Sequence, residues 1–164
     1  MRPAALWLVV AALTVPVRAP AQTAYSIDFG ALMAFDDAAI QIGFRATPSV
    51  ANKAGADILL ATFPDALAHG FMLFLLDVDA TYGAPLGEQV TLFPRFGGTI
   101  LAGGGNGGSG GAYGYNLGVG VLGRVSPTLG VRIDYTHHRL VGSSGGGSGT
   151  LPFSSITFGI VWMH

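Results

Sequence analysis

Apolar and small or polar residues alternate along most of the chain after residue 24. Over residues 25–35 the odd positions are apolar or aromatic, and the even positions are mostly small or acidic. Residues 38–47 repeat the pattern after the pair Asp36 and Asp37. A period of two is typical of a β-strand with two different faces. The short separation between the two segments predicts a hairpin.

The same alternation predicts further strands over residues 90–100, 113–125, 129–136 and 155–162, and one long strand over 69–82. Residues 54–64 fit either an eighth strand or a short helix. The Gly/Ser-rich residues 103–111 and 141–150 are expected to be flexible loops, and Ser126-Pro127 to form a tight turn. A meander with long loops at one end and short turns at the other follows from this spacing. Pro94 lacks a backbone donor, so we expect a bulge there.

Composition indicates which face of these strands points outward and which points into the fold. Charged residues make up only 10% of the chain, against roughly 25% in ordinary soluble domains, and 26 of the 164 residues are glycine. The less apolar faces carry glycine, serine, threonine and isolated charges, which suit a narrow interior better than a soluble surface. The prediction is an all-β fold, an eight-stranded antiparallel up-and-down transmembrane β-barrel whose apolar faces meet lipid. A soluble exported β-barrel or sandwich that binds an apolar ligand stays open as an alternative.

The first 21 residues have the three parts of a secretory signal peptide. Arg2 gives a positive start, an apolar stretch of about 12 residues is too short to span a bilayer, and Ala19-Pro20-Ala21 forms a small-x-small cleavage pattern. We therefore predict a signal peptide over 1–21 and the barrel over 22–164. Over 22–164 six basic residues face nine acidic ones, a net charge of 6 − 9 = −3. This balance argues against nucleic-acid binding, and the absence of cysteine excludes a lipoprotein anchor and a disulfide scaffold.

Aromatic residues are expected near the two rims of the barrel, as in the girdles of membrane barrels. With the N-terminus on the periplasmic side, Tyr25, Tyr82 and Trp162 fall at the periplasmic rim. The external rim receives Phe35, Tyr113, Tyr115, Tyr135 and Phe153.

Two segments carry a family resemblance. Residues 117–135 (LGVGVLGRVSPTLGVRIDY) look like the strand, tight turn and strand near the end of small barrels, and residues 156–162 look like their final strand. The chain thus resembles the outer-membrane β-barrel domain superfamily, the small OmpA/OmpX-like barrels. The resemblance implies an outer-membrane location, a monomer, contact with outer-membrane lipids and lipopolysaccharide, and assembly by the outer-membrane insertion machinery. It does not imply a function, because such barrels serve structural, adhesive, permeation and enzymatic roles.

A polar network is predicted inside the barrel. Its members are Asp28, Arg45, Arg95, Asn116, Arg124, Arg132 and Asp134, with Gln41 and Thr136 on the same faces. Buried arginines and aspartates should pair, because an unpaired buried charge costs several kcal/mol. An eight-stranded interior is just wide enough to be filled by side chains. We therefore expect a filled lumen and a structural or surface-exposed role, with a selective arginine-lined pathway as the alternative. No cofactor or metal is predicted.

His137 and His138 are the remaining candidates for chemistry. Neighbouring strand residues face opposite sides, so the pair is not expected to chelate one metal, and polarity at the external rim explains it. A lipid A-modifying hydrolase is the enzymatic alternative, but its His-x-Ser pattern on one strand is missing, since Arg139 and Leu140 occupy the serine positions. We therefore predict that the protein is not an enzyme.

Overall fold

The computed structural model describes residues 23–34, 37–48, 54–105, 108–144 and 147–164. The predicted signal peptide, residues 1–21, and the predicted girdle residue Phe35 lie outside these ranges. The strands are β1 (Ala24–Ala34), β2 (Asp37–Thr47), β3 (Ala54–Thr62), β4 (Phe71–Tyr82), β5 (Ala84–Pro85), β6 (Val90–Gly105), β7 (Gly108–Arg124), β8 (Leu129–Ser144) and β9 (Gly147–Met163).

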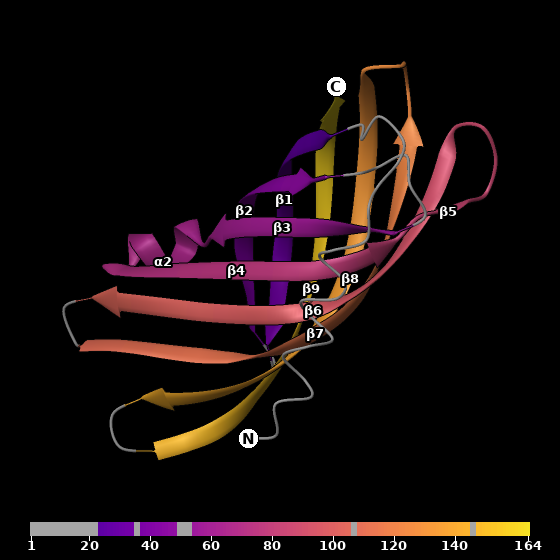
Figure 1. The fold of residues 1–164 in the computed structure, drawn as a ribbon. Helices are drawn as coiled ribbons and strands as arrows, with labels where there is room; N and C mark the ends of the chain where they lie inside the picture. The colour runs from indigo at the N-terminus through magenta and orange to yellow at the C-terminus, as the bar shows by residue number, and fades with distance from the viewer. Residues whose placement is uncertain (1–22, 35–36, 49–53, 106–107, 145–146) are drawn as a thin grey trace, which may run out of the picture.

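A single antiparallel sheet closes on itself (Figure 1). Each long strand pairs with its neighbours in sequence, β1 pairs with β9, and a β4–β6 ladder completes the circle. The two-residue strand β5 continues the β4 side of that ladder in the same register. The predicted eight-stranded up-and-down barrel is therefore confirmed.

The segment that the sequence left undecided contains both element types. Residues 54–62 form strand β3, and a single helical turn, α2 (Pro64–Ala68), connects it to β4. Pro64 stands in the first turn of α2, where a missing backbone N–H costs nothing. Among the described residues, no helix is both long and apolar enough to cross a membrane.

The Gly/Ser-rich segments are strands for most of their length, so the prediction of two flexible loops is wrong. The β6–β7 ladder runs without a break to the pair Gly105–Gly108, and the β8–β9 ladder runs to Ser144–Gly147. Backbone hydrogen bonds need no side chain, and consecutive ladder bonds hold these small residues extended. We call this end of the barrel the hairpin end, and the end that holds Ala24 and Met163 the terminal end.

Pro94 lies in an uninterrupted β6–β7 register opposite Val119, so the expected bulge is absent. On its other side Pro94 falls between the last β4 pair, Thr81–Arg95, and the first β5 pair, Ala84–Leu92. The ladder is open at this point, so proline's missing donor leaves no described partner unpaired.

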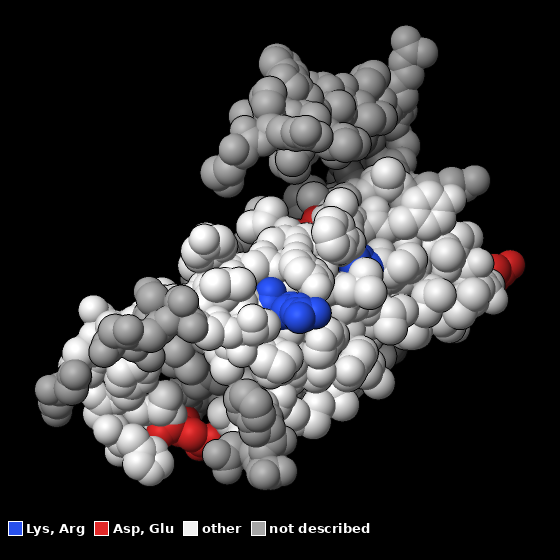
Figure 2. All heavy atoms as spheres, turned by 90° about the horizontal axis from the view of Figure 1, so that it is seen from below, with Lys and Arg blue, Asp and Glu red and all other residues white. Residues whose placement is uncertain are grey.

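Successive side chains alternate between an apolar outer surface, which we call the outer wall, and the interior of the barrel. On β1, Phe29 is half exposed on the outside, whereas Asp28 is fully buried on the inside. Charged groups are few and isolated on the face shown in Figure 2. The aromatics Tyr25, Tyr82, Trp162, Tyr113, Tyr115 and Tyr135 all point outward, as expected. Phe153 was expected in the external girdle, but it is buried, because the odd positions of β9 face the interior.

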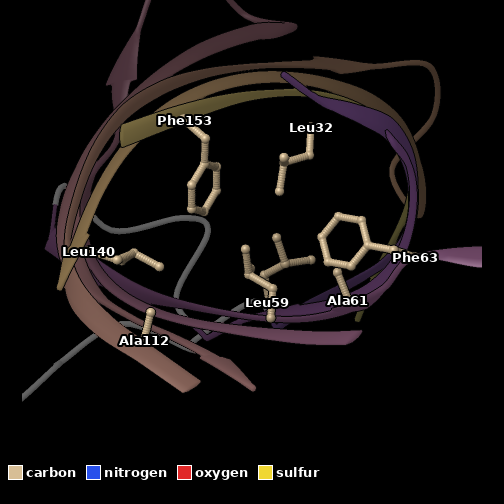
Figure 3. Close-up of a cluster of buried hydrophobic side chains, with 8 residues drawn as sticks. Leu32, Leu59, Ala61, Phe63, Ala112, Leu140 and Phe153 are labelled. Atoms are coloured by element: carbon tan, nitrogen blue, oxygen red, sulfur yellow. The ribbon is translucent and has the colours of Figure 1, made fainter. Parts of the chain in front are cut away.

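Two apolar layers occupy the interior, one near each end. The hairpin-end layer contains Leu32, Leu59, Ala61, Phe63, Leu75, Ala112, Leu140 and Phe153, which point inward from the wall (Figure 3). The terminal-end layer contains Ala24, Phe93, Leu122, Val161 and Met163. The polar residues of the interior lie between these two layers along the strands.

Candidate functional site in the barrel interior

The middle of the barrel holds a buried network of ion pairs, which we call the interior network. Its members are Asp28, Arg45, Asp57, Arg95, Arg132 and Asp134, with Asp79 at its margin. They come from β1, β2, β3, β6, β8 and β4, so the network ties together strands on opposite sides of the barrel. Each of these side chains is almost completely buried.

Asp57 is the centre of the interior network. Its Oδ2 lies 2.6 Å from Nη2 of Arg132, 2.8 Å from Nη1 of Arg45 and 3.5 Å from Nη1 of Arg95. The hydroxyl of Thr47 donates a hydrogen bond to its other oxygen. One carboxylate therefore balances parts of three guanidinium groups, which would otherwise repel one another in a medium of low polarity.

Two further carboxylates, Asp28 and Asp134, bind the arginines from the margins of the network. Arg45 Nε donates to Asp28 at 2.6 Å, and Arg132 Nε donates to Asp134 at 2.8 Å. The Arg132 guanidinium also stands 5.4 Å from the ring centre of Phe93, a cation–π distance that connects the network to the terminal-end layer.

Glycine makes room for these side chains. A Cβ added to Gly120 would collide with Asp134 Oδ1, and a Cβ added to Gly159 would collide with Asp28 Oδ1. Gly97 stands in the same relation to Asp79, and a Cβ on Gly118 would lie 2.8 Å from Arg95 Nε. At these four inward positions, glycine leaves room for the charged side chains that lie across them.

A second polar group lies between the interior network and the hairpin-end layer. His138 Nε2 is 3.1 Å from Asp77 Oδ2, and Thr99 donates to the other oxygen of Asp77 at 2.5 Å. Asn116 Nδ2 donates to Asp79 at 2.8 Å and to Thr99 at 3.0 Å. The imidazole of His138 stacks on Phe153 with 4.4 Å between ring centres. This group, the His138 cluster, lies on the hairpin-end side of the arginines.

An apolar cup opens above the hairpin-end layer. It is a cavity of about 310 Å³ between the β6–β7 and β8–β9 hairpins and the start of β4. Leu73, Leu101 and Leu151 line it, together with Phe71, Ala112, Thr150 and five glycines. None of its lining side chains is charged.

Comparisons with known proteins identify the architecture. The chain matches no protein-family model and no curated protein in sequence. Solved structures match nearly its whole length. Outer membrane protein OprG from Pseudomonas aeruginosa has a TM-score of 0.61 at 12% identity, over 88% of this chain and 96% of that one. Neisserial surface protein A has 0.58 at 12%, over 88% and 97%.

The chain has the fold of the small outer-membrane β-barrels. A de novo designed transmembrane β-barrel also matches this outer-membrane-type barrel, with a TM-score of 0.55 at 16% identity over 90% of this chain and 98% of the design. Natural and designed proteins share this backbone at low sequence identity, so the shared fold does not establish an activity.

The structure places most of the predicted interior residues together. Asp28, Arg45, Arg95, Arg132 and Asp134 are in the interior network, and Asn116 is in the His138 cluster. Arg124 was predicted in the same network, but the structure does not place it there. It is only partly buried at the terminal end of β7 and forms no ion pair with the described residues. Arg124 is the last residue of β7, four residues beyond Gly120, the glycine that packs against Asp134.

Sequence reasoning missed Asp57, Asp77, Asp79 and His138. Asp57 was not predicted in the network because residues 54–64 were not assigned to a strand. Asp77 and Asp79 share one face of β4 with Leu73 and Leu75, and these leucines conceal the inward direction of that face in the sequence. His138 was assigned to rim polarity, which is wrong, since it is fully buried. The period of two from Asp134 through Thr136 could have placed it inside.

The interior polar groups contact one another across the barrel. Among the residues that the structure describes, no group of three or more metal-ligating side chains has the geometry to hold an ion. The interior carboxylates are bonded to arginine, histidine, threonine or asparagine side chains. A path along the axis would have to cross the hairpin-end layer, the His138 cluster, the interior network and the terminal-end layer.

Proposed function

We propose that this protein is a closed barrel of the outer membrane with a structural or surface-exposed role, which conducts no solute through its lumen. One observation carries the proposal: the interior is filled by a paired ionic layer between two apolar layers. The apolar outer wall, with exposed residues such as Ile133 and Phe158, supports a location in lipid.

Opening the lumen would require the separation of several buried ion pairs. Breaking a buried ion pair by removing one partner costs about 3–5 kcal/mol. Arg45, Arg95 and Arg132 each face at least two carboxylates, and withdrawing any one of them exposes several charges at once. Ions would also meet the apolar layers, where they cannot replace their water of hydration.

Single-channel recording in planar bilayers tests the closed lumen. We expect no conductance steps from the refolded chain beyond those of a protein-free bilayer. The variant Leu140→Gly with Phe153→Gly thins the hairpin-end layer, but it leaves the interior network, and we expect it to stay closed. Steady conductance of the unaltered chain would refute the proposal.

Location and orientation can be tested with introduced cysteines, because the natural chain has none. We propose that the hairpin end faces outward. Ser109→Cys lies on the hairpin end of β7, and Thr128→Cys lies in the turn at the terminal end. A membrane-impermeant maleimide added to whole cells should label the first and not the second. Equal labelling, or release of the protein in soluble form, would contradict the proposal.

The apolar cup favours a second candidate function, binding of a small uncharged apolar molecule from the outside. Its volume is at the lower end of the range for ligand pockets, about 300–1,000 Å³. A side chain added at Gly149 meets nothing within 4 Å, so Gly149→Leu should fill the cup without strain. Gly87→Leu is the matched control, since its surroundings are equally open at the terminal end.

Toluene titrated into nanodiscs that contain the protein should shift the amide resonances of Ala112 and Gly142 in a saturable way. Gly149→Leu should abolish the shift, and Gly87→Leu should not. Shifts spread evenly over the outer wall would show partition into lipid instead.

A further inference from the structure

We propose that the outer wall of the barrel carries a binding site for the phosphate group of an outer-leaflet lipid, formed by Arg139 and His137 and shaped by Tyr135 and Ser154. The site faces lipid and is separate from the interior. The proposal rests on the outer-membrane location and outward hairpin end proposed above.

Arg139 is an exception on the outer wall. Among the outward-facing strand positions whose side chains the structure describes, it is the only lysine, arginine, aspartate or glutamate. It is exposed on β8, and it forms no ion pair with the described residues. Arg45, Arg95 and Arg132, by contrast, face the interior and are paired there. This lone cation on the described outer wall is free to bind an anionic group from outside the chain.

The position of Arg139 along β8 matches a lipid head-group level. The outward residues Leu129, Val131 and Ile133 are apolar, and polarity begins at Tyr135 and continues through His137. An arginine on the lipid face costs about 2–4 kcal/mol at the bilayer midplane and about 0–1 kcal/mol near the interface. Tyr115, the cross-strand partner of Arg139 on β7, is also exposed, and tyrosine is enriched at this level.

Cross-strand hydrogen bonds hold the site in shape. Ser154 on β9 lies directly opposite His137, and its Oγ is 3.1 Å from His137 Nδ1 and 3.1 Å from the hydroxyl of Tyr135. With Nδ1 engaged, Nε2 of His137 has no hydrogen-bond partner among the described residues. The imidazole is thereby oriented with one free nitrogen, two residues from the Arg139 guanidinium on the same face of β8.

The chemistry of these groups favours a phosphate attached to an apolar body. Guanidinium binds phosphate through paired N–H donors, and an imidazole N–H adds a further donor. The apolar wall beside the site, with Ile133 and Ile156, would pack against acyl chains. A Ser–His contact is also what an acyl hydrolase uses, but no carboxylate among the described residues contacts His137. Binding is therefore favoured, and hydrolysis becomes an outcome of the test.

Native mass spectrometry of the detergent-purified full chain, titrated with lipid A, tests the proposal. We expect a saturable lipid A adduct, and about tenfold weaker binding by the double variant Arg139→Gln with His137→Gln, the scale of a charge-assisted hydrogen bond. Arg124→Gln is the matched control: it removes the same charge at the opposite end and should leave binding unchanged. Dephosphorylated lipid A should bind the unaltered chain as weakly as lipid A binds the double variant.

Any one of four results would overturn the proposal. The double variant could bind lipid A as well as the unaltered chain, or Arg124→Gln could lose as much. Inorganic phosphate at millimolar concentration could displace the lipid completely, which would assign the site to the free anion. The unaltered chain could cleave acyl chains from lipid A while Ser154→Ala does not, which would make the cluster hydrolytic. Because binding is measured on purified protein, failure of the location experiment and failure of this site are distinguishable.

Discussion

The sharpest prediction compares two aspartates of the interior. Asp57 is bonded to Arg132 and Arg45 at 2.6 and 2.8 Å and lies 3.5 Å from Arg95. Asp79 approaches an arginine only at 3.8 Å, and its Oδ2 accepts no hydrogen bond within the protein. The substitutions Asp57→Asn and Asp79→Asn remove one carboxylate charge each with almost no change in volume. Their effects on stability should therefore report the pairing itself.

The expected magnitudes follow from these contacts. Asp57→Asn leaves three buried guanidinium groups without their shared carboxylate, and we expect the free energy of unfolding to fall by about 3–5 kcal/mol. Asp79→Asn removes one of four aspartates that face three arginines in this network, and the new amide oxygen can still accept from Asn116. We expect a change of less than about 1 kcal/mol there.

Equilibrium urea unfolding of the barrel in lipid vesicles provides the measurement. Trp162 is the one tryptophan of residues 22–164, and its place on the outer wall makes its emission sensitive to removal from lipid. Adding Arg132→Gln completes a double-mutant cycle with Asp57→Asn, and the two losses should be strongly non-additive. Equal costs for the two aspartates, or strict additivity in the cycle, would refute the assignment of Asp57 as the centre.

Other predictions concern the glycines, the apolar layer and the wall. Gly120→Ala places a methyl group against Asp134 and should cost about 1–3 kcal/mol, whereas Gly98→Ala, whose nearest neighbour would be 3.8 Å away, should be nearly neutral in the same urea assay. Leu140→Ala in the hairpin-end layer should cost about 2–5 kcal/mol, while Val141→Ala on the outward face of the same strand should cost far less; similar melting temperatures would contradict the inward direction of Leu140. Ile133→Arg should destabilise the barrel by about 2–4 kcal/mol. The measurement is the urea concentration at which the unboiled protein stops migrating as a folded barrel on gels, and this concentration should fall. Thr150→Arg is the control and should leave it unchanged.

The period of two determined much of this protein before any fold was known. Alternation assigns Asp28, Arg45, Arg132 and Asp134 to one face of their strands and Ile27, Phe44 and Ile133 to the other. Low charge and high glycine content then decide which face is inside. Strand direction and face follow from local geometry alone, because successive side chains on a strand point to opposite sides.

Only the closed sheet decided which charges meet. Asp57 and Arg132 are 75 residues apart, and their contact depends on the curvature that brings β3 and β8 across the barrel from each other. Closure also brought His138 to Asp77 on β4, whereas pairing within two hairpins drew the Gly/Ser segments into the β6–β7 and β8–β9 ladders. Arg124 stayed outside the network. Ladder register and barrel closure are long-range properties: they depend on the pairing of whole strands, which the local alternation of side chains does not specify.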